Sequence, residues 1–255
     1  MTTLTAVEQT SLANDRPRAG MVWAMLFART GLAIGLQAGV AVIALVAGSR
    51  DPWRTSADWW LGWFALANVL TLVLLRFAFN REGRRLRDLY AVRLGTVRRD
   101  LPWVAGALLL AGPIAFLPNI VLGQGLWGSS QAGADLSFRA LPLLGAIAIL
   151  AVFPIVQGAA ELPTYFGYVM PRLESSYGWR TRALIASAFM LSSQHIFLPL
   201  LFDWRFLVWR GLMFLPFAFW IGFVIQRRPS TLPYLAVAHG LLDASLPLLV
   251  LTASI

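Results

Sequence analysis

Long apolar stretches constrain the fold of this chain more than any other feature of its sequence. A helix needs about 20 apolar residues to cross the ~30 Å hydrocarbon core of a bilayer. Stretches of about that length occur at residues 21–48, 59–79, 103–123, 140–160, 183–202, 206–225 and 232–253. Backbone polar groups in lipid must hydrogen-bond to one another, so these stretches predict helices. We therefore expect an all-α, polytopic transmembrane bundle of about seven spans.

The composition excludes the main alternatives to a membrane protein. Of the 255 residues, 58% are hydrophobic and 13% are charged, and this charged share is about half that of a typical soluble domain. A soluble core of this size could not bury so much apolar surface, and a disordered chain would be far more polar. The sequence also lacks cysteine, which excludes disulfides and thiolate metal sites.

All 21 basic residues are arginines, and most of them flank the apolar stretches. The positive-inside rule explains such loops better than a nucleic-acid partner does, so we expect the lipid bilayer and no nucleic acid as partner. The arginine-rich connections alternate along the chain and place the N-terminus in the cytoplasm. Abundant arginine and alanine without lysine are typical of GC-rich bacterial genomes. We therefore expect a multi-pass protein of the bacterial inner (plasma) membrane.

The chain divides into three parts on this view. Residues 1–20 form a polar N-terminal tail, residues 21–139 contain the first three spans and their loops, and residues 140–255 contain the candidate site. Gly31, Gly35 and Gly39 recur every four residues in the first span, which favours close packing against another helix. Pro163 and Pro199 lack a backbone donor, so we expect the helices to bend there.

Four ionisable side chains are the candidate functional residues because they lie inside apolar stretches: Glu161, His195, His239 and Asp243. Such a group costs at least about 2.5–3.5 kcal/mol at the centre of a membrane helix. At 1.5 Å per residue, all four lie about 10–18 Å from the cytoplasmic ends of three spans. His239 and Asp243 share one helix face, since they are four residues apart. We expect the four side chains to meet in one wet pocket.

Two arginines, Arg29 and Arg210, also fall inside apolar stretches. Each lies within a few turns of a span end, so its side chain could extend to the membrane interface. Alternatively, one of them could pair with a buried acid, which would then be a structural residue rather than a functional one.

The stretch at 161–174, ELPTYFGYVMPRLE, resembles the first motif of the CAAX-protease and bacteriocin-processing (CPBP) family of intramembrane endopeptidases. That motif is EExxxRG, followed by Tyr and a PRLE-like tail, and Gly167, Tyr168 and residues 171–174 match it. The resemblance covers about residues 149–250.

The two histidines continue this resemblance in the order that the family shows. His195 matches the histidine of the second motif, FxxxH, although Leu191 replaces its phenylalanine. His239 and Asp243 match the third motif, HxxxN or HxxxD, in full.

The resemblance implies hydrolysis of peptide bonds in membrane-associated peptides or proteins. It assigns Glu161 as general base toward water, and His195 as a residue that binds the water or a metal. His239 and Asp243 would stabilise the oxyanion or complete the site. These four residues are also an acceptable ligand set for Zn²⁺ or another divalent metal. A glutamate–histidine mechanism without bound metal is the alternative that the family suggests.

The first motif departs from the family at two charged positions. Aligned on Gly167, Leu162 replaces the second glutamate and Phe166 replaces the arginine. Shifting the alignment by one residue instead places Ala160 at the first glutamate and Tyr165 at the arginine. Either alignment removes the charged pair that would brace the site. This leaves open an inactive family member that acts as an immunity factor or scaffold. A proton-coupled transporter is a third interpretation, since Glu, His and Asp can relay protons.

Overall fold

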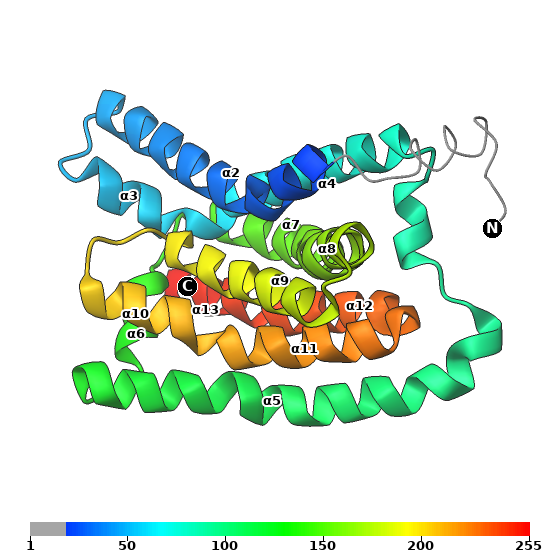
Figure 1. Cartoon of the computed structure of the whole chain (residues 1–255). Coiled ribbons are helices and arrows are strands. Elements are labelled where there is room, and N and C mark those ends of the chain that lie inside the picture. The colour runs from blue at the N-terminus through cyan, green and yellow to red at the C-terminus, as the bar shows by residue number, and fades with distance from the viewer. Residues whose placement is uncertain (1–18) are drawn as a thin grey trace, which may run out of the picture.

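The computed structural model describes residues 19–255, which form a bundle of helices with no strand in that range (Figure 1). The predicted all-α fold is confirmed. The predicted polar tail lies outside the described residues, except for Ala19 and Gly20, which begin the first helix. In chain order the elements are α2 (Ala19–Val46), α3 (Pro52–Asp58), α4 (Trp60–Arg81), η1 (Leu86–Tyr90), η2 (Leu94–Thr96), α5 (Val97–Trp127), α6 (Ala132–Ser137), α7 (Leu143–Leu162), η3 (Pro163–Val169), α8 (Met170–Tyr177), α9 (Arg180–Gln194), η4 (His195–Phe197), α10 (Trp204–Met213), α11 (Leu215–Arg227), η5 (Pro229–Thr231), α12 (Leu232–Asp243) and α13 (Ser245–Ser254).

Six helical segments within residues 19–255 are long and apolar enough to cross a membrane, and the chain is a multi-pass membrane protein. They are Ala19–Val46, Trp60–Arg81, Leu86–Trp127, Leu143–Tyr177, Trp204–Arg227 and Pro229–Ser254. The predicted fifth span, residues 183–202, is not among them. Its helix, α9, has 15 residues and gives way to the short η4 and an irregular segment. The count of seven therefore stays a prediction.

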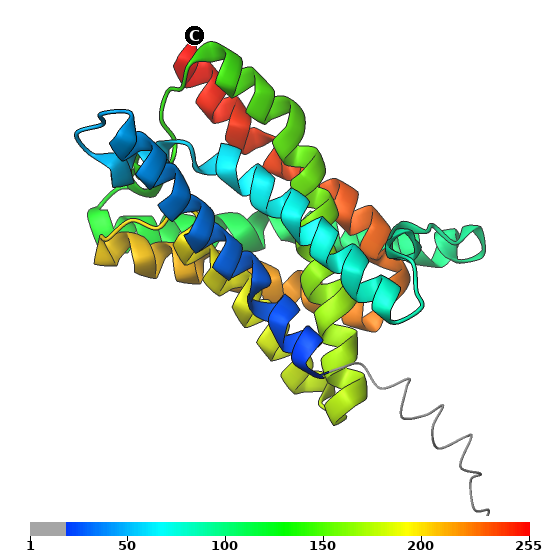
Figure 2. The same ribbon diagram turned by 90° about the horizontal axis from the view of Figure 1, so that it is seen from above.

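Helix α7 occupies the middle of the bundle and packs against α4, α12 and α13. On one side of it, α2 and α4 run next to each other, as the view from above shows (Figure 2). On the other side, α9 packs on α11, and α5 lies along the outside of α10 and α11 (Figure 1). Residues on α2, α4, α7, α9 and α12 can therefore meet in the interior.

The burial pattern differs from that of a soluble protein, because many apolar side chains are exposed and several polar ones are buried beside the apolar core. Large apolar side chains point outward along α4, including Val69, Val73 and Phe77. Arg29 and Asn68 are completely buried. Outward apolar surface suits lipid, and buried polar groups in a membrane bundle are paired with one another.

The two prolines behave differently from each other. At Pro163, α7 widens into the π-helical η3, a local expansion that is frequent at functional sites. The bend predicted at Pro199 does not occur, because α9 has already ended at Gln194. The carbonyl of His195, which a bend would free, instead accepts the Leu198 N–H at 3.1 Å.

Ion pairs tie the arginine-bearing connections together at one end of the bundle. Arg172 of α8 pairs with Glu82, which follows α4, and the Tyr168 hydroxyl donates to Glu82 Oε1 at 3.0 Å. Arg228, after α11, pairs with Asp100 at 2.8 Å. Burial raises the pKa of Glu82, but hydrogen bonding and charge from Arg172 outweigh it and leave that pKa below its ordinary value. This grouping agrees with the predicted charge asymmetry, while the side that faces the cytoplasm stays a prediction.

Candidate active site

Two glycines let α7 and α12 approach each other closely beside the candidate residues. A Cβ on Gly240 would lie 2.6 Å from the Pro154 carbonyl oxygen and 3.2 Å from Gly158 Cα. Real Cβ atoms do not approach backbone atoms so closely, so a side chain at this position would force the helices apart. The close contact lies one turn or less from Glu161 on α7 and His239 on α12.

The glycine stripe on α2 does not make the close helix contact that its spacing predicts. A Cβ on Gly31, Gly35 or Gly39 would meet nothing within 4 Å among the described residues. The three glycines are exposed, because α2 turns the face of Arg29 and Gln37 inward instead. The expectation was wrong because burying the polar face of α2 decides its rotation in the bundle.

We expect Gly240→Ala to lower the free energy of unfolding by about 1–3 kcal/mol, the usual cost of overpacking. Gly31→Ala is the matched control, since alanine there meets open space and favours a helix by up to about 1 kcal/mol. Unfolding of both variants in detergent would be compared with that of the wild type. Equal stability of the two variants would contradict the close α7–α12 contact.

The structure brings Glu161, His239 and Asp243 into direct contact. His239 Nε2 lies 2.9 Å from Glu161 Oε1 and 3.3 Å from Asp243 Oδ2. The Glu161 side chain is 1% exposed, whereas that of Asp243 is 19% exposed. The histidine is thus held between two carboxylates, and Asp243 is the more exposed side of the cluster.

The second oxygen of Glu161 is held by three donors from three different helices. Oε2 accepts hydrogen bonds from Arg29 Nη2 at 3.0 Å, Gln157 Nε2 at 3.0 Å and Gln194 Nε2 at 2.6 Å. A carboxylate oxygen has about two lone-pair positions, so Oε2 is fully used. Oε1 has His239 as its one partner among the described residues, which leaves room for one more donor.

Arg29 organises this cluster from α2. Its Nε donates to Gln194 Oε1 at 2.9 Å, and its Nη1 donates to Asn68 Oδ1 at 2.7 Å. Its Nη2 also donates to Gln157 Oε1 at 3.2 Å, and the guanidinium lies over the Phe64 ring. The side chain is 0% exposed, so it does not extend to the interface. The structure instead shows the alternative contact, in which Arg29 pairs with a buried acid, Glu161.

Arg210 is also buried and does not extend to the interface. Its guanidinium donates through Nε and Nη2 to the Leu198 carbonyl oxygen and is surrounded by the rings of Trp60, Phe206 and Trp209. The expectation for both arginines rested on their distance from a span end along the sequence. That distance does not say which way a side chain points, and inward rotation gives both guanidinium groups hydrogen-bond acceptors in the interior.

His195 is buried beside this cluster but is not hydrogen-bonded to it. It is 9% exposed, its ring packs on Phe214 with 4.2 Å between centroids, and its Nδ1 lies 2.9 Å from the Leu191 carbonyl oxygen. Within residues 19–255 it makes no hydrogen bond to Glu161, His239 or Asp243. The neighbouring residue, Gln194, contacts Glu161 in its place. A donor at Nδ1 leaves Nε2 of the neutral ring as an acceptor.

Sequence reasoning missed the amides that complete the cluster. Asn68, Gln157 and Gln194 are buried and link Arg29 to Glu161, and the Tyr165 hydroxyl donates to Gln194 Oε1 at 3.0 Å. Amides inside apolar stretches are a weaker form of the signal that ionisable groups give there, because a polar group in a membrane helix also needs a partner. Gln157 also lies one helical turn before Glu161, a spacing that places both on one face.

The contacts among the four candidate residues do not favour a metal ion between them, and the predicted metal stays a prediction. Within residues 19–255, no group of three or more His, Asp and Glu side chains is placed to hold a metal ion. Glu161 and His239 bond to each other directly, and Arg29 already supplies a positive charge to Glu161. Both contacts oppose a dication between these side chains. We therefore derive no step through Zn²⁺ or another metal.

The cluster and the bundle around it are the grounds for assigning a function. Comparisons of the chain with protein family models, with curated proteins and with solved structures find no match. The resemblance of three motifs to the CPBP family thus stays a resemblance.

Proposed function

We propose that this chain is an intramembrane endopeptidase that hydrolyses membrane-associated peptides or proteins. The observation that supports it is the contact of Glu161, His239 and Asp243 inside a membrane bundle. Buried ionisable groups are costly in a bilayer and are concentrated at working sites. Peptide hydrolysis needs a base for water, a stabiliser for the oxyanion and a proton for the leaving amine, and this cluster contains groups of these types.

In the proposed reaction, Oε1 of Glu161 is the atom that accepts a proton from the attacking water. Arg29, Gln157 and Gln194 fix the other oxygen and keep the carboxylate oriented. As the water oxygen attacks the scissile carbonyl carbon, Oε1 takes one of its protons. The same proton then passes to the amide nitrogen, the C–N bond breaks, and a carboxylic acid and an amine leave.

The two histidines have different roles in this proposal. His239 lies between Glu161 and Asp243, which hold its ring so that it can stabilise charge developing beside Oε1. His195 is oriented by the Leu191 carbonyl, and its Nε2 accepts a hydrogen bond from the attacking water. Asp243 lies at the more exposed side of the cluster, where it holds the His239 ring.

One observation favours a second candidate function, an inactive scaffold or immunity factor. The ion pair of Glu161 with Arg29, together with two amide donors, is what a purely structural buried carboxylate requires. Leu162 and Phe166, both buried and apolar, replace the charged residues of the family motif. A scaffold would keep the fold without cleaving peptides.

A peptidase assay in proteoliposomes separates these functions. The full chain would be offered a fluorogenic peptide library with acyl anchors, and we expect cleavage by the wild type that a chelator does not reduce. His195→Ala should lower kcat by about 10² or more, the usual contribution of a group that acts on the proton transfers. A fully folded wild type that cleaves none of the peptides would favour the scaffold, and proton-driven solute uptake would favour a transporter.

A further inference from the structure

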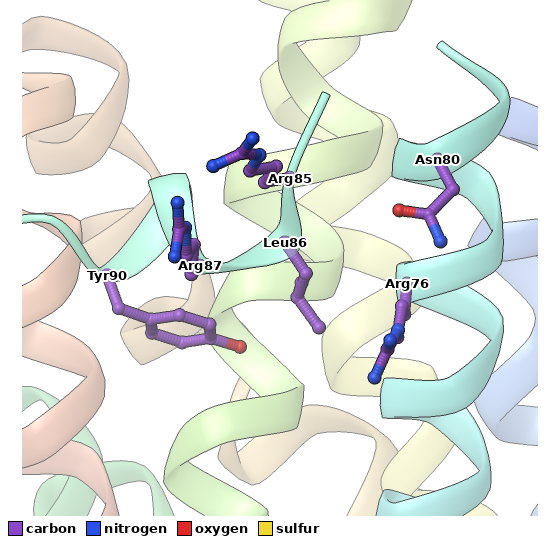
Figure 3. A pocket seen from close by; sticks show the side chains of 6 residues that line it. All are labelled: Arg76, Asn80, Arg85, Leu86, Arg87 and Tyr90. Carbon is purple, nitrogen blue, oxygen red and sulfur yellow. The ribbon is translucent and has the colours of Figure 1, made fainter. Parts of the chain in front are cut away.

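A cavity of about 470 Å³ lies at the arginine-rich end of the bundle, and none of its lining residues belongs to the candidate active site. Its volume falls in the range of small-ligand sites. One wall comes from the last turns of α4 and the other from η1 and the residue before it (Figure 3). The lining residues are Arg76, Asn80, Arg85, Leu86, Arg87 and Tyr90.

Positive charge borders the cavity, although most of its lining surface is apolar. Three of its six lining residues are arginines and none is acidic. The ion pairs within residues 19–255 engage Arg29, Arg54, Arg172, Arg180 and Arg228, and none engages a cavity arginine. The nearby Asp88 accepts the backbone N–H of Arg85 at 3.3 Å. The three exposed guanidinium groups are therefore available to an anion at the border of the cavity, and a planar guanidinium group pairs well with phosphate oxygens.

The cavity adjoins surface that suits acyl chains. Arg76 lies on α4 between Val73 and Phe77, which are 59% and 46% exposed. Exposed apolar side chains continue along the same helix at Leu66, Val69 and Leu70. A free inorganic anion or a nucleic acid would make no use of this apolar surface, whereas a phospholipid would use both parts.

The wall formed by η1 is anchored to the core. The Tyr90 hydroxyl donates to the Ala159 carbonyl oxygen on α7 at 2.7 Å, and Figure 3 shows the Leu86 side chain directed into the space beside α4. The cavity is therefore built from fixed elements and is not a gap beside a loose loop.

We propose that this cavity binds the phosphodiester headgroup of an anionic phospholipid, with the acyl chains along the outer face of α4. Basic pockets beside membrane helices bind such headgroups by the same combination of charge and apolar surface. This inference does not depend on peptidase activity.

The test measures lipid binding to the full detergent-purified chain by native mass spectrometry. The probes are phosphatidylglycerol, phosphatidylcholine with the same acyl chains, and inorganic phosphate. Arg85→Gln combined with Arg87→Gln removes two cavity charges, and Arg98→Gln combined with Arg99→Gln is the matched control. The control removes the same charge from exposed residues at the start of α5 that do not line the cavity.

We expect the cavity variant to bind phosphatidylglycerol about 30-fold more weakly than the control variant, since each of the two arginines contributes about 1 kcal/mol near a headgroup. The wild type should prefer phosphatidylglycerol to phosphatidylcholine. Equal losses in both double variants would show only general surface charge and would overturn the inference. Binding of inorganic phosphate as tight as that of the lipid would also overturn the inference. If the double variant does not fold, Arg76→Gln provides the same comparison against Arg98→Gln.

Discussion

Replacing Glu161 by glutamine is expected to reduce peptide cleavage by roughly two to four orders of magnitude, the usual contribution of a general base. Glutamine keeps the size of the side chain and can still accept hydrogen bonds from Arg29 and Gln194 through its carbonyl oxygen. It cannot take a proton from water, so the loss should appear in kcat and leave KM largely unchanged. Single-turnover cleavage of an anchored peptide in proteoliposomes is the measurement.

The matched control for Glu161→Gln is Glu174→Gln. Glu174 lies in the middle of α8, and its carboxylate is 37% exposed and 3.8 Å from Arg180. The two variants carry the same chemical change, but the control lies far from the hydrogen bonds of the cluster. Cleavage by Glu161→Gln at the rate of the control would remove Glu161 from the reaction and leave the structural role of its ion pair with Arg29.

Removing Arg29 is expected to be the most destabilising substitution in the described part of the chain. Arg29→Met should lower the free energy of unfolding by about 3–5 kcal/mol, because it leaves Glu161 as a buried charge without its cation. Adding Glu161→Gln should recover part of this loss, since a neutral amide needs no counter-charge. Unfolding of the two single variants and the double variant in detergent forms a double-mutant cycle that isolates the pair.

Arg54→Met is the control for this cycle. Arg54 pairs with Asp58 at 3.0 Å, but both side chains are about a quarter exposed, so the loss should stay within about 1 kcal/mol. A similar small loss for Arg29→Met would show that the cluster is wetter than its burial indicates. No recovery in the double variant would show that Arg29 acts through Asn68 and the amides rather than through Glu161.

Much of the fold could be predicted from the sequence. Hydropathy identified the helical class and the approximate position of most spans, because the cost of exposing backbone in lipid is the same for any sequence. The exception is α9, where residues 183–202 are apolar enough but the helix ends at Gln194. The breaks within the other spans at Phe214 and Ala244 were also not predicted.

The candidate site was only partly predictable. Ionisable groups are scarce inside the apolar stretches, so the sequence indicated Glu161, His239 and Asp243, which the structure places in contact. It also indicated His195, which lies beside the cluster. Their catalytic roles stay a prediction. The partners of Glu161 were not predicted, because Arg29 is 132 residues away in the chain and Gln194 is an uncharged residue.

The sequence by itself determined which side chains are too costly to face lipid, since that cost depends on the residue and on the apolar character of its own segment. Only the tertiary structure decided which groups they meet. The rotation and separation of the helices determine those partners. Both depend on packing contacts such as that between Gly158 and Gly240. The cation that pairs with Glu161 is therefore Arg29 on α2, and spacing along the chain gives no indication of it.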